Sequence, residues 1–312
     1  MAERKSREEK MSEIQEKLEK GVRDIFESDK YREYISTMSK FPNYSINNCI
    51  LIASQKPEAS YVCGFNKWKE LGRAVNKGSH GIMIIAPVKV KKDMEEPIYD
   101  ENRRPVVDAS GKCLTEKVTK EFQTFRPVYV FDYMDTTGDP LPTLATMLDE
   151  KVDSFEQLKE ILIRVSPVPV TFEAITGRAN GYFVPGEQRI VVKENLPELQ
   201  MVKTMIHEIG HASLGHGGKE DKWDRETKEI QAESVAYWVT QMLGLDTSDY
   251  SFGYIGGWSK DKEVTELKEN LDLIKTTADE ISKKIELELN QTVEKEETKE
   301  QEEQVQRSHI RK

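Results

Sequence analysis

The sequence predicts an α+β protein of two domains. Its 312 residues are enough for two apolar cores. Helical and strand-like apolar patterns occupy residues 1–135, and a second set of both kinds begins near residue 151. The segment between them, residues 136–150, contains Gly138, Pro140 and Pro142 and has the composition of a linker.

Helical patterns dominate the start of the chain. Residues 11–27 place their apolar side chains on one stripe of a helix, and a short helix near 29–39 follows. Ser45 is a suitable N-cap for a third helix, which continues to about Gln55 and is closed by Pro57.

Short strands and one helical turn complete the first domain. Strands are expected at 60–63, 81–88 and 125–133, with the helical turn at 66–71. The run 81–88 is continuously apolar, so we expect this strand to be buried on both faces. The polar residues 93–120 predict a hairpin excursion or a mobile loop.

The second domain is expected to begin with a helix, a strand and a hairpin, at 154–165, 168–173 and 181–193. Two further helices are expected around 196–211 and 226–243. The predicted organisation is a first domain at 1–135, the linker, a second domain at 151–258, a C-terminal helix at 259–290 and a disordered charged tail at 291–312.

His207-Glu-Ile-Gly-His211 has the residue types and spacing of a catalytic metal site. His207 and His211 lie one turn apart on a helix, so both imidazoles can bind one Zn²⁺ and leave room for a third ligand and a water. Glu208 can accept the proton of the water that attacks a carbonyl. A small sheet followed by such a helix is the order of elements expected of a zincin metallopeptidase.

Glu229 and Glu233 are the candidates for completing the site. They lie one turn apart on the helix predicted at 226–243, so one can bind the metal while the other orients a ligand imidazole. We assign Glu229 to the metal, as in gluzincins, and Glu233 to the imidazole. His216 is the rival third ligand, although its spacing departs from the metzincin pattern and Gly215 marks the expected end of the helix.

Composition excludes several classes of protein. No apolar run reaches membrane-spanning length and the first residues are polar, so we expect a cytoplasmic protein without a membrane partner. The three cysteines lack metal-ligand spacing and fit a reducing compartment. The net charge is −10, yet residues 56–92 contain eight basic and two acidic residues, which indicates a possible polyanion surface.

Four segments of the first half of the chain form a set of motifs: residues 44–52 (YSINNCILI), 64–78 (GFNKWKELGRAVNKG), 81–87 (GIMIIAP) and 130–138 (VFDYMDTTG). Together they resemble the N-terminal domain of ArdC-like antirestriction proteins, with 130–138 as its closing strand and exit.

The histidine motif, with Glu229 and Glu233, is similar to the metallopeptidase domain of the same family, which is related to the ImmA/IrrE peptidases. The resemblance implies a domain that binds single-stranded DNA and a Zn²⁺ peptidase-like domain. It also implies carriage on a mobile genetic element and protection of incoming DNA from host restriction.

The residues assigned to DNA binding are Trp68, Lys67, Lys69, Arg73, Lys77, Asn47 and Asn48. Trp68 can stack on a base while its neighbouring lysines meet phosphates. The alternative for Trp68 is a core residue that fixes the helical turn to the sheet.

We therefore expect an antirestriction-type protein that binds single-stranded DNA and carries a zinc metallopeptidase domain acting on an unidentified protein substrate. Two alternatives remain open: a regulatory peptidase that cleaves a repressor, and a DNA-binding protein whose metal site is not catalytic. Glu208 argues against the last, because a structural zinc needs no base.

Overall fold

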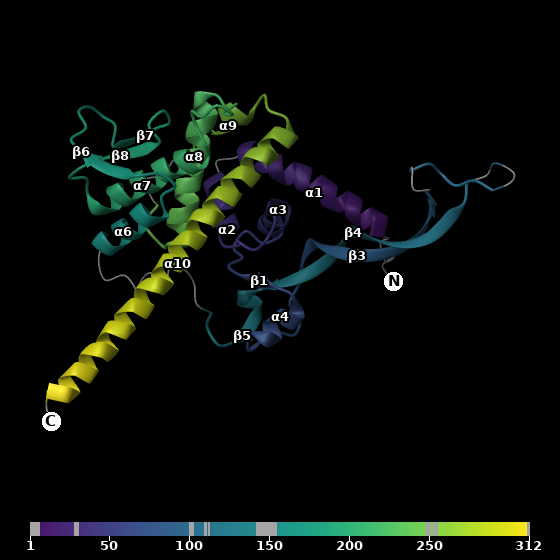
Figure 1. Cartoon of the computed structure of the whole chain (residues 1–312), viewed down its shortest axis with the longest axis horizontal. Helices are drawn as coiled ribbons and strands as arrows, with labels where there is room; N and C mark the ends of the chain where they lie inside the picture. The colour runs from purple at the N-terminus through teal and green to yellow at the C-terminus, as the bar shows by residue number, and fades with distance from the viewer. Residues whose placement is uncertain are drawn as a thin grey trace.

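The computed structural model describes residues 7–27, 31–99, 103–108, 111, 113–141, 155–247, 250, 252 and 255–310. A helical body carries a small sheet on one side and a projecting β-hairpin on the other, and the long helix α10 (Val264–Ile310) crosses it diagonally (Figure 1). The mixture of helices and strands confirms the predicted α+β class.

Three helices open the N-terminal part. The described elements there are α1 (Arg7–Glu27), α2 (Tyr31–Met38), α3 (Ile46–Gln55), β1 (Val62–Cys63), α4 (Phe65–Glu70), β2 (Arg73–Val75), β3 (Ile82–Pro97), β4 (Thr115–Asp132), the 3-10 turn Tyr133–Asp135 and β5 (Thr136–Gly138). Strands β1, β4 and β3 form one antiparallel sheet in that order, and β2 pairs with β5. Ser45 caps α3, as predicted, by accepting a hydrogen bond from the backbone of Asn48.

The strand predicted at 81–88 is longer and more exposed than expected. β3 and β4 remain paired from Ile82 and Val130 to Pro97 and Thr115, so much of the polar segment forms a hairpin. On β3 the buried residues are the first three, residues 82–84. The prediction of burial on both faces was wrong beyond that point because the hairpin leaves the body there (Figure 1).

Two amide side chains of α3 bind the outer edge of β3. Asn48 donates to the carbonyl of Ile85 at 2.9 Å and accepts from its N–H at 3.0 Å. Gln55, two turns later, makes the same pair of bonds with Met83 at 2.9 and 3.1 Å. Successive outward-facing peptide groups of this edge are thereby satisfied, which protects the strand against pairing with another chain.

The second part contains a three-stranded sheet under a pair of helices. Its described elements are α6 (Phe155–Val165), β6 (Val170–Glu173), β7 (Gly181–Val184), β8 (Arg189–Lys193), α7 (Glu198–Ser213), α8 (Arg225–Met242) and α9 (Ile255–Ser259). The central strand β8 is parallel to β6 and antiparallel to β7, which confirms the predicted hairpin. α7 packs on this sheet and α8 packs on α7.

The N-terminal helices and the second part share one apolar core. α10 contacts α8 and α6 and also α1 and α3. Tyr31 and Ser234 hydrogen-bond at 2.9 Å, and Lys275 of α10 donates to the carbonyl of Pro42 at 3.1 Å. Because the same core holds both parts, neither is expected to keep its full stability alone.

Two expected boundaries differ from the structure. The charged tail at 291–312, expected to be disordered, continues α10 as far as Ile310. Its Glu, Lys and Gln residues are good helix formers, and no Gly or Pro interrupts them. The expected linker at 136–150 begins with β5, which pairs back onto β2, while residues 142–150 lie outside the described ones. Within the described ranges, no helix is both long and apolar enough to span a membrane.

Candidate metal centre

Helix α7 approaches α8 closely at the histidine motif. Its buried apolar residues, Met205, Ile206 and Ile209 among them, hold it in the core. A Cβ on Gly210 would lie 3.5 Å from Val235 and 3.6 Å from the carbonyl of Ala232, in ordinary contact with α8. The helices are therefore close enough for side chains of both to meet, with room at this position for a methyl group at most.

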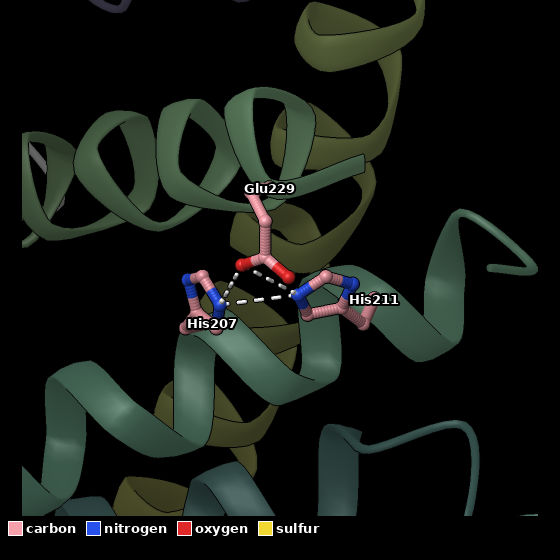
Figure 2. A group of neighbouring side chains, drawn as sticks. All are labelled: His207, His211 and Glu229. Carbon is pink, nitrogen blue, oxygen red and sulfur yellow. Dashed lines mark hydrogen bonds and ion pairs between the residues drawn. The ribbon is translucent and has the colours of Figure 1, made fainter. Parts of the chain in front are cut away.

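His207, His211 and Glu229 converge in this space (Figure 2). The Nε2 atoms of the two histidines lie 3.1 Å apart. An oxygen of Glu229, which comes from the second turn of α8, lies 3.7 Å from Nε2 of His207 and 3.8 Å from Nε2 of His211. The structure therefore brings together the three predicted ligands.

The donor set fits a zinc ion. Ligand atoms about 2.0–2.1 Å from a tetrahedral zinc are separated by roughly 3.3–3.4 Å. The three observed separations lie on either side of that value, so small side-chain adjustments suffice. Two imidazoles and a carboxylate are also the donors of known catalytic zinc sites, which keep a further position open.

Glu233 lies behind His207, with a carboxylate oxygen 3.3 Å from Nδ1. A carboxylate there accepts the Nδ1 proton, so Nε2 is the nitrogen that faces Glu229 and His211 and would bind a metal. This is the arrangement that the sequence predicted for Glu233.

The charges at the centre favour a cation. Burial lowers the pKa of His207, but the neighbouring carboxylates of Glu229 and Glu233 outweigh it and raise the pKa to about 10 in the metal-free protein. The imidazoles of His207 and His211 beside it hold the pKa of Glu229 well below its usual range. The carboxylates of Glu229 and Glu233, which stabilise the extra proton on His207, would equally stabilise a divalent metal ion that replaces this proton.

Glu208 lies beside strand β7, where the backbone N–H of Phe183 is directed to its carboxylate. Its side chain is buried, and burial raises its pKa although His207 and His211 lower it. A cavity of about 260 Å³ opens beside it, with Asn180, Gln200 and Lys203 in its wall. Glu208 is thus a buried carboxyl of raised pKa beside a cavity.

His216, the rival third ligand, occupies a different position. Its Nδ1 lies 2.7 Å from Nδ1 of His211, on the side of that ring opposite Glu229, and its Nε2 lies 2.8 Å from the amide oxygen of Gln231. Burial lowers the pKa of His216 to about 4, so the ring is neutral near pH 7. Gly215 follows the end of α7 with φ +70°, as expected for a residue after the C-cap.

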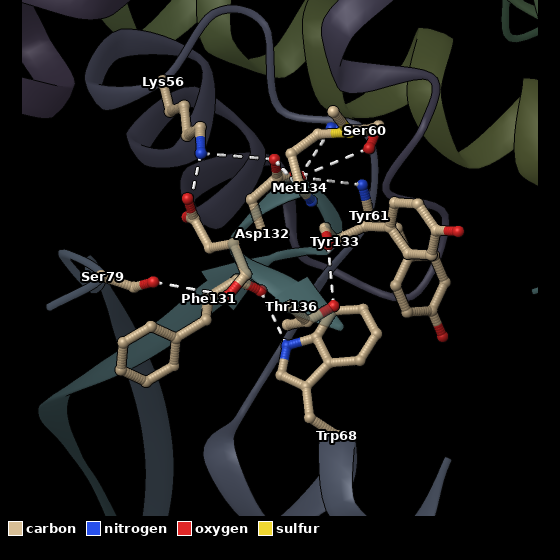
Figure 3. A network of polar contacts seen from close by, with 11 residues as sticks. Lys56, Ser60, Tyr61, Trp68, Ser79, Phe131, Asp132, Tyr133, Met134 and Thr136 are labelled. Carbon is tan, nitrogen blue, oxygen red and sulfur yellow. Dashed lines mark hydrogen bonds and ion pairs between the residues drawn. The ribbon is translucent and has the colours of Figure 1, made fainter. Parts of the chain in front are cut away.

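Trp68 is a core residue, so the prediction that it stacks on DNA was wrong. Its side chain is fully buried and contacts the rings of Tyr61 and Tyr133, and its Nε1 donates to the carbonyl of Phe131 at 2.9 Å (Figure 3). The alternative is the one observed: the indole fixes α4 to the end of β4.

Arg73 and Asn48 were also assigned wrongly to DNA, because their polar groups are already bound. Arg73 is buried and donates to Thr136 and to the carbonyl of Gly138. Asn48 binds the edge of β3. Asn47 is half-buried and its amide oxygen has no hydrogen-bond partner among the described residues.

The lysines of the predicted DNA surface remain exposed. Lys67 forms an ion pair with Glu70 at 2.9 Å, and Lys69 lies over the ring of Phe65. Lys77 is exposed in the turn after β2. These three side chains are available to a polyanion, although the aromatic residue that was to accompany them is not.

A group of exposed aromatic residues on β4 was not predicted from the sequence. Phe122, Phe125 and Tyr129 are 43%, 46% and 52% exposed. A strand that carries aromatic residues on both faces beside Lys and Arg, instead of alternating apolar and polar, was the signal available in the sequence.

Comparison with known proteins gives relatives at low identity. An uncharacterized protein of Bacillus anthracis is 27% identical over 297 residues, which is 85% of this chain and 50% of the relative. The chain thus spans about half the length of that protein. The metal-free crystal structure of the antirestriction ArdC protein from the R388 plasmid is 20% identical with a TM-score of 0.41, covering 80% of this chain and 86% of that one. Its Mn(II)-bound form is 18% identical with a TM-score of 0.42, covering 80% and 84%.

Two family models match consecutive parts of the chain. The N-terminal domain of anti-restriction factor ArdC matches residues 4–131. The IrrE N-terminal-like domain, of the M78 peptidase family, matches residues 163–240 and includes the whole ligand cluster. The expected pair of domains is present in the expected order, and the chain is an ArdC-like protein in which an ArdC N-terminal domain precedes an IrrE-like peptidase-type domain.

Proposed function

We propose that the second part of the chain is a zinc-dependent peptidase. The observation that carries the proposal is the convergence of His207, His211 and Glu229 beside a buried base and a cavity. Bound zinc would polarise the scissile carbonyl and make water a better nucleophile at neutral pH.

Glu208 has the role of general base and acid. It accepts the proton of the attacking water as the new C–O bond forms, and donates it to the amine nitrogen as the C–N bond breaks. Its raised pKa supports both transfers. Glu233 orients His207 and takes no part in the proton transfer.

Strand β7 is the proposed binding edge for the substrate. Within the described residues, β7 pairs with β8 alone, so its other edge can accept an extended peptide. The backbone N–H of Phe183 is directed to Glu208, which puts this edge beside the base. Gly181 lies close to Thr204 and Glu208 of α7, so the strand runs along the cavity.

Proteolysis profiling of the full chain tests this function, in the presence and absence of single-stranded DNA. Wild type should produce cleavage products that Glu208→Gln does not, since an amide cannot accept the proton of water. Identical product sets from the two proteins would remove the peptidase proposal and favour a metal site that is not catalytic.

We further propose that the N-terminal part binds single-stranded DNA through the β3–β4 hairpin. The match to the ArdC N-terminal domain supports nucleic acid as the partner. Between residues 85–92 and 120–130 the hairpin has five basic residues and one acidic residue beside the three exposed aromatic rings. Stacking rings beside cations is the usual chemistry of single-strand binding.

The stacking rings proposed are Phe125 and Tyr129. They are four residues apart on β4, so their side chains lie on the same face of the strand. In the neighbouring strand β3, Pro87 pairs with Phe125 and Met83 pairs with Tyr129. Lys91, Lys92 and Arg126 are exposed nearby and would meet phosphates. Affinity is therefore expected to fall as salt concentration rises.

DNA binding is tested on the full chain, because the N-terminal helices share a core with α10. Phe125→Ala and Tyr129→Ala should each weaken binding by about 1–3 kcal/mol without changing the melting temperature. Tyr182→Ala removes an aromatic ring of 41% exposure from β7 and serves as the control. If all three variants bind single-stranded DNA with the affinity of wild type, the DNA-binding surface lies outside these two residues of the hairpin.

Together these activities would suit an antirestriction protein that protects incoming DNA on a mobile element. A regulatory peptidase that cleaves a repressor would use the same centre. The two differ in whether cells need Glu208 for protection of incoming DNA, which a restriction assay with Glu208→Gln measures.

A further inference from the structure

A buried line of hydrogen bonds connects the backbone of α10 to the back of His211. Asn270 Nδ2 donates to the carbonyl of Glu266 at 2.9 Å. Gln231 Nε2 donates to Asn270 Oδ1 at 2.7 Å, and Gln231 Oε1 lies 2.8 Å from Nε2 of His216. Nδ1 of His216 lies 2.7 Å from Nδ1 of His211.

The carbonyl at one end determines the direction of every bond in this line. A backbone carbonyl can only accept, so the amide group of Asn270 must face it and its oxygen must face Gln231. The oxygen of Gln231 then faces His216, whose Nε2 must carry a proton to donate. A neutral imidazole has one donor and one acceptor nitrogen, so Nδ1 of His216 accepts from Nδ1–H of His211. Nε2 of His211 is left as a lone pair, directed at His207 and Glu229.

We propose that Asn270, acting through Gln231 and His216, is a positioning residue that fixes His211 in the tautomer able to bind a metal. The inference rests on the proposed metal site and makes α10 a working part of that site. Asn270 lies outside the segment 163–240 that matches the IrrE-like domain, so the role belongs to the C-terminal helix.

Burial allows only one hydrogen-bonding pattern along this line of side chains. Asn270 and Gln231 have no exposed surface and His216 is 4% exposed, so water cannot readily replace a missing partner. An unsatisfied buried polar group is costly, which forces the amides into the one pattern that satisfies all of them. The two ligands are thus held differently: His207 by a carboxylate directly, and His211 by neutral groups that lead to a backbone carbonyl.

The tautomers are measured directly in the metal-free full chain, from long-range proton–nitrogen correlation spectra of histidine-labelled protein. The expected result is a proton on Nδ1 of His211 and on Nε2 of His216. The opposite tautomer on either ring in wild type would overturn the proposal, whether or not any variant folds.

Asn270→Leu removes the acceptor for Gln231, whose amide is then free to rotate and donate to His216. The expected result is the inverted tautomer on both rings and a roughly 10–100-fold loss of Zn²⁺ affinity, measured by competition with a chromophoric chelator. Asn270→Asp keeps an acceptor toward Gln231 and should restore the wild-type tautomers and most of the affinity.

Leu271→Ala is the matched control, because Leu271 is equally buried on α10 and lies outside the hydrogen-bonded line. It should lower the melting temperature and leave tautomers and Zn²⁺ affinity unchanged. A folded Asn270→Leu protein with wild-type tautomers and affinity would overturn the proposal. Wild type with the expected tautomers but no Zn²⁺ binding would refute the proposed metal function and leave the positioning of His211 standing.

Discussion

His207 and His211 lie one turn apart on α7 with their Nε2 atoms 3.1 Å apart, and each ring is held from behind by a different partner. Nδ1 of His207 faces the carboxylate of Glu233, while Nδ1 of His211 faces the neutral ring of His216. Both Nε2 atoms consequently face the carboxylate of Glu229.

Glu229→Ala should reduce Zn²⁺ affinity by more than the roughly 10–100-fold that is typical when only a supporting partner of a ligand is lost. Two imidazoles alone leave the ion short of protein ligands. Glu226→Ala is the control, since Glu226 is exposed one turn earlier on α8. Unchanged affinity of the Glu229 variant, or stronger loss with His216→Ala, would show that the third ligand is misassigned.

Gly181→Ala should lower peptidase activity and stability together. A Cβ there would lie 2.7 Å from the methyl group of Thr204 and 3.3 Å from Cγ of Glu208, so β7 or the base must move. Gly186→Ala, in the turn after β7, meets no atom within 4 Å and should behave as wild type. Thermal melting and a cleavage assay on both variants distinguish a local clash from a general intolerance of alanine in this hairpin.

Asp132→Asn should destabilise the fold by about 2–3 kcal/mol, the range for losing hydrogen bonds to a buried charged group. The carboxylate is fully buried and accepts the backbone N–H groups of Ser60, Tyr61 and Met134, with Lys56 3.3 Å away (Figure 3). Asp135→Asn, which removes a more exposed partner of Lys56, should cost less than about 1 kcal/mol. Urea unfolding of the two variants measures the difference; equal losses would contradict the assigned role of Asp132.

Asp221 should contribute stability that is lost in acid. Burial raises its pKa, but the N–H groups of Gly217 and Trp223 and the ammonium of Lys228 outweigh this and lower the pKa to about 2. The unfolded carboxyl has a pKa of about 3.9, so the contribution is complete above about pH 4 and disappears as the pH falls toward 2. Asp221→Asn should therefore be less stable than wild type at pH 6, with the gap closing between pH 4 and 2. A gap independent of pH would contradict this.

The convergence of His207, His211 and Glu229 was predictable from sequence because most of its geometry is local. The spacing of four residues between the histidines, and again between Glu229 and Glu233, places each pair on one helical face whatever surrounds it. The sequence says less about how α7 and α8 pack together. The order of the two motifs was nevertheless enough to choose Glu229 as the third ligand.

Trp68 and Asn270 show what sequence patterns do not contain. The surroundings of Trp68 come from Phe131 and Tyr133, more than sixty residues away. Asn270 lies 39 residues from the amide that it binds. Both roles depend on tertiary contacts, and a polar or aromatic residue beside charged ones has the same sequence signature whether it is buried or exposed.

The zinc content of the purified full chain tests the central claim most directly. Wild type should bind about one Zn²⁺ per chain that a chelator removes, His207→Ala should bind none, and Glu208→Gln should bind as much as wild type while losing peptidase activity. Zinc retained by His207→Ala, or a Glu208→Gln protein that cleaves at the wild-type rate, would contradict the assignment of this centre.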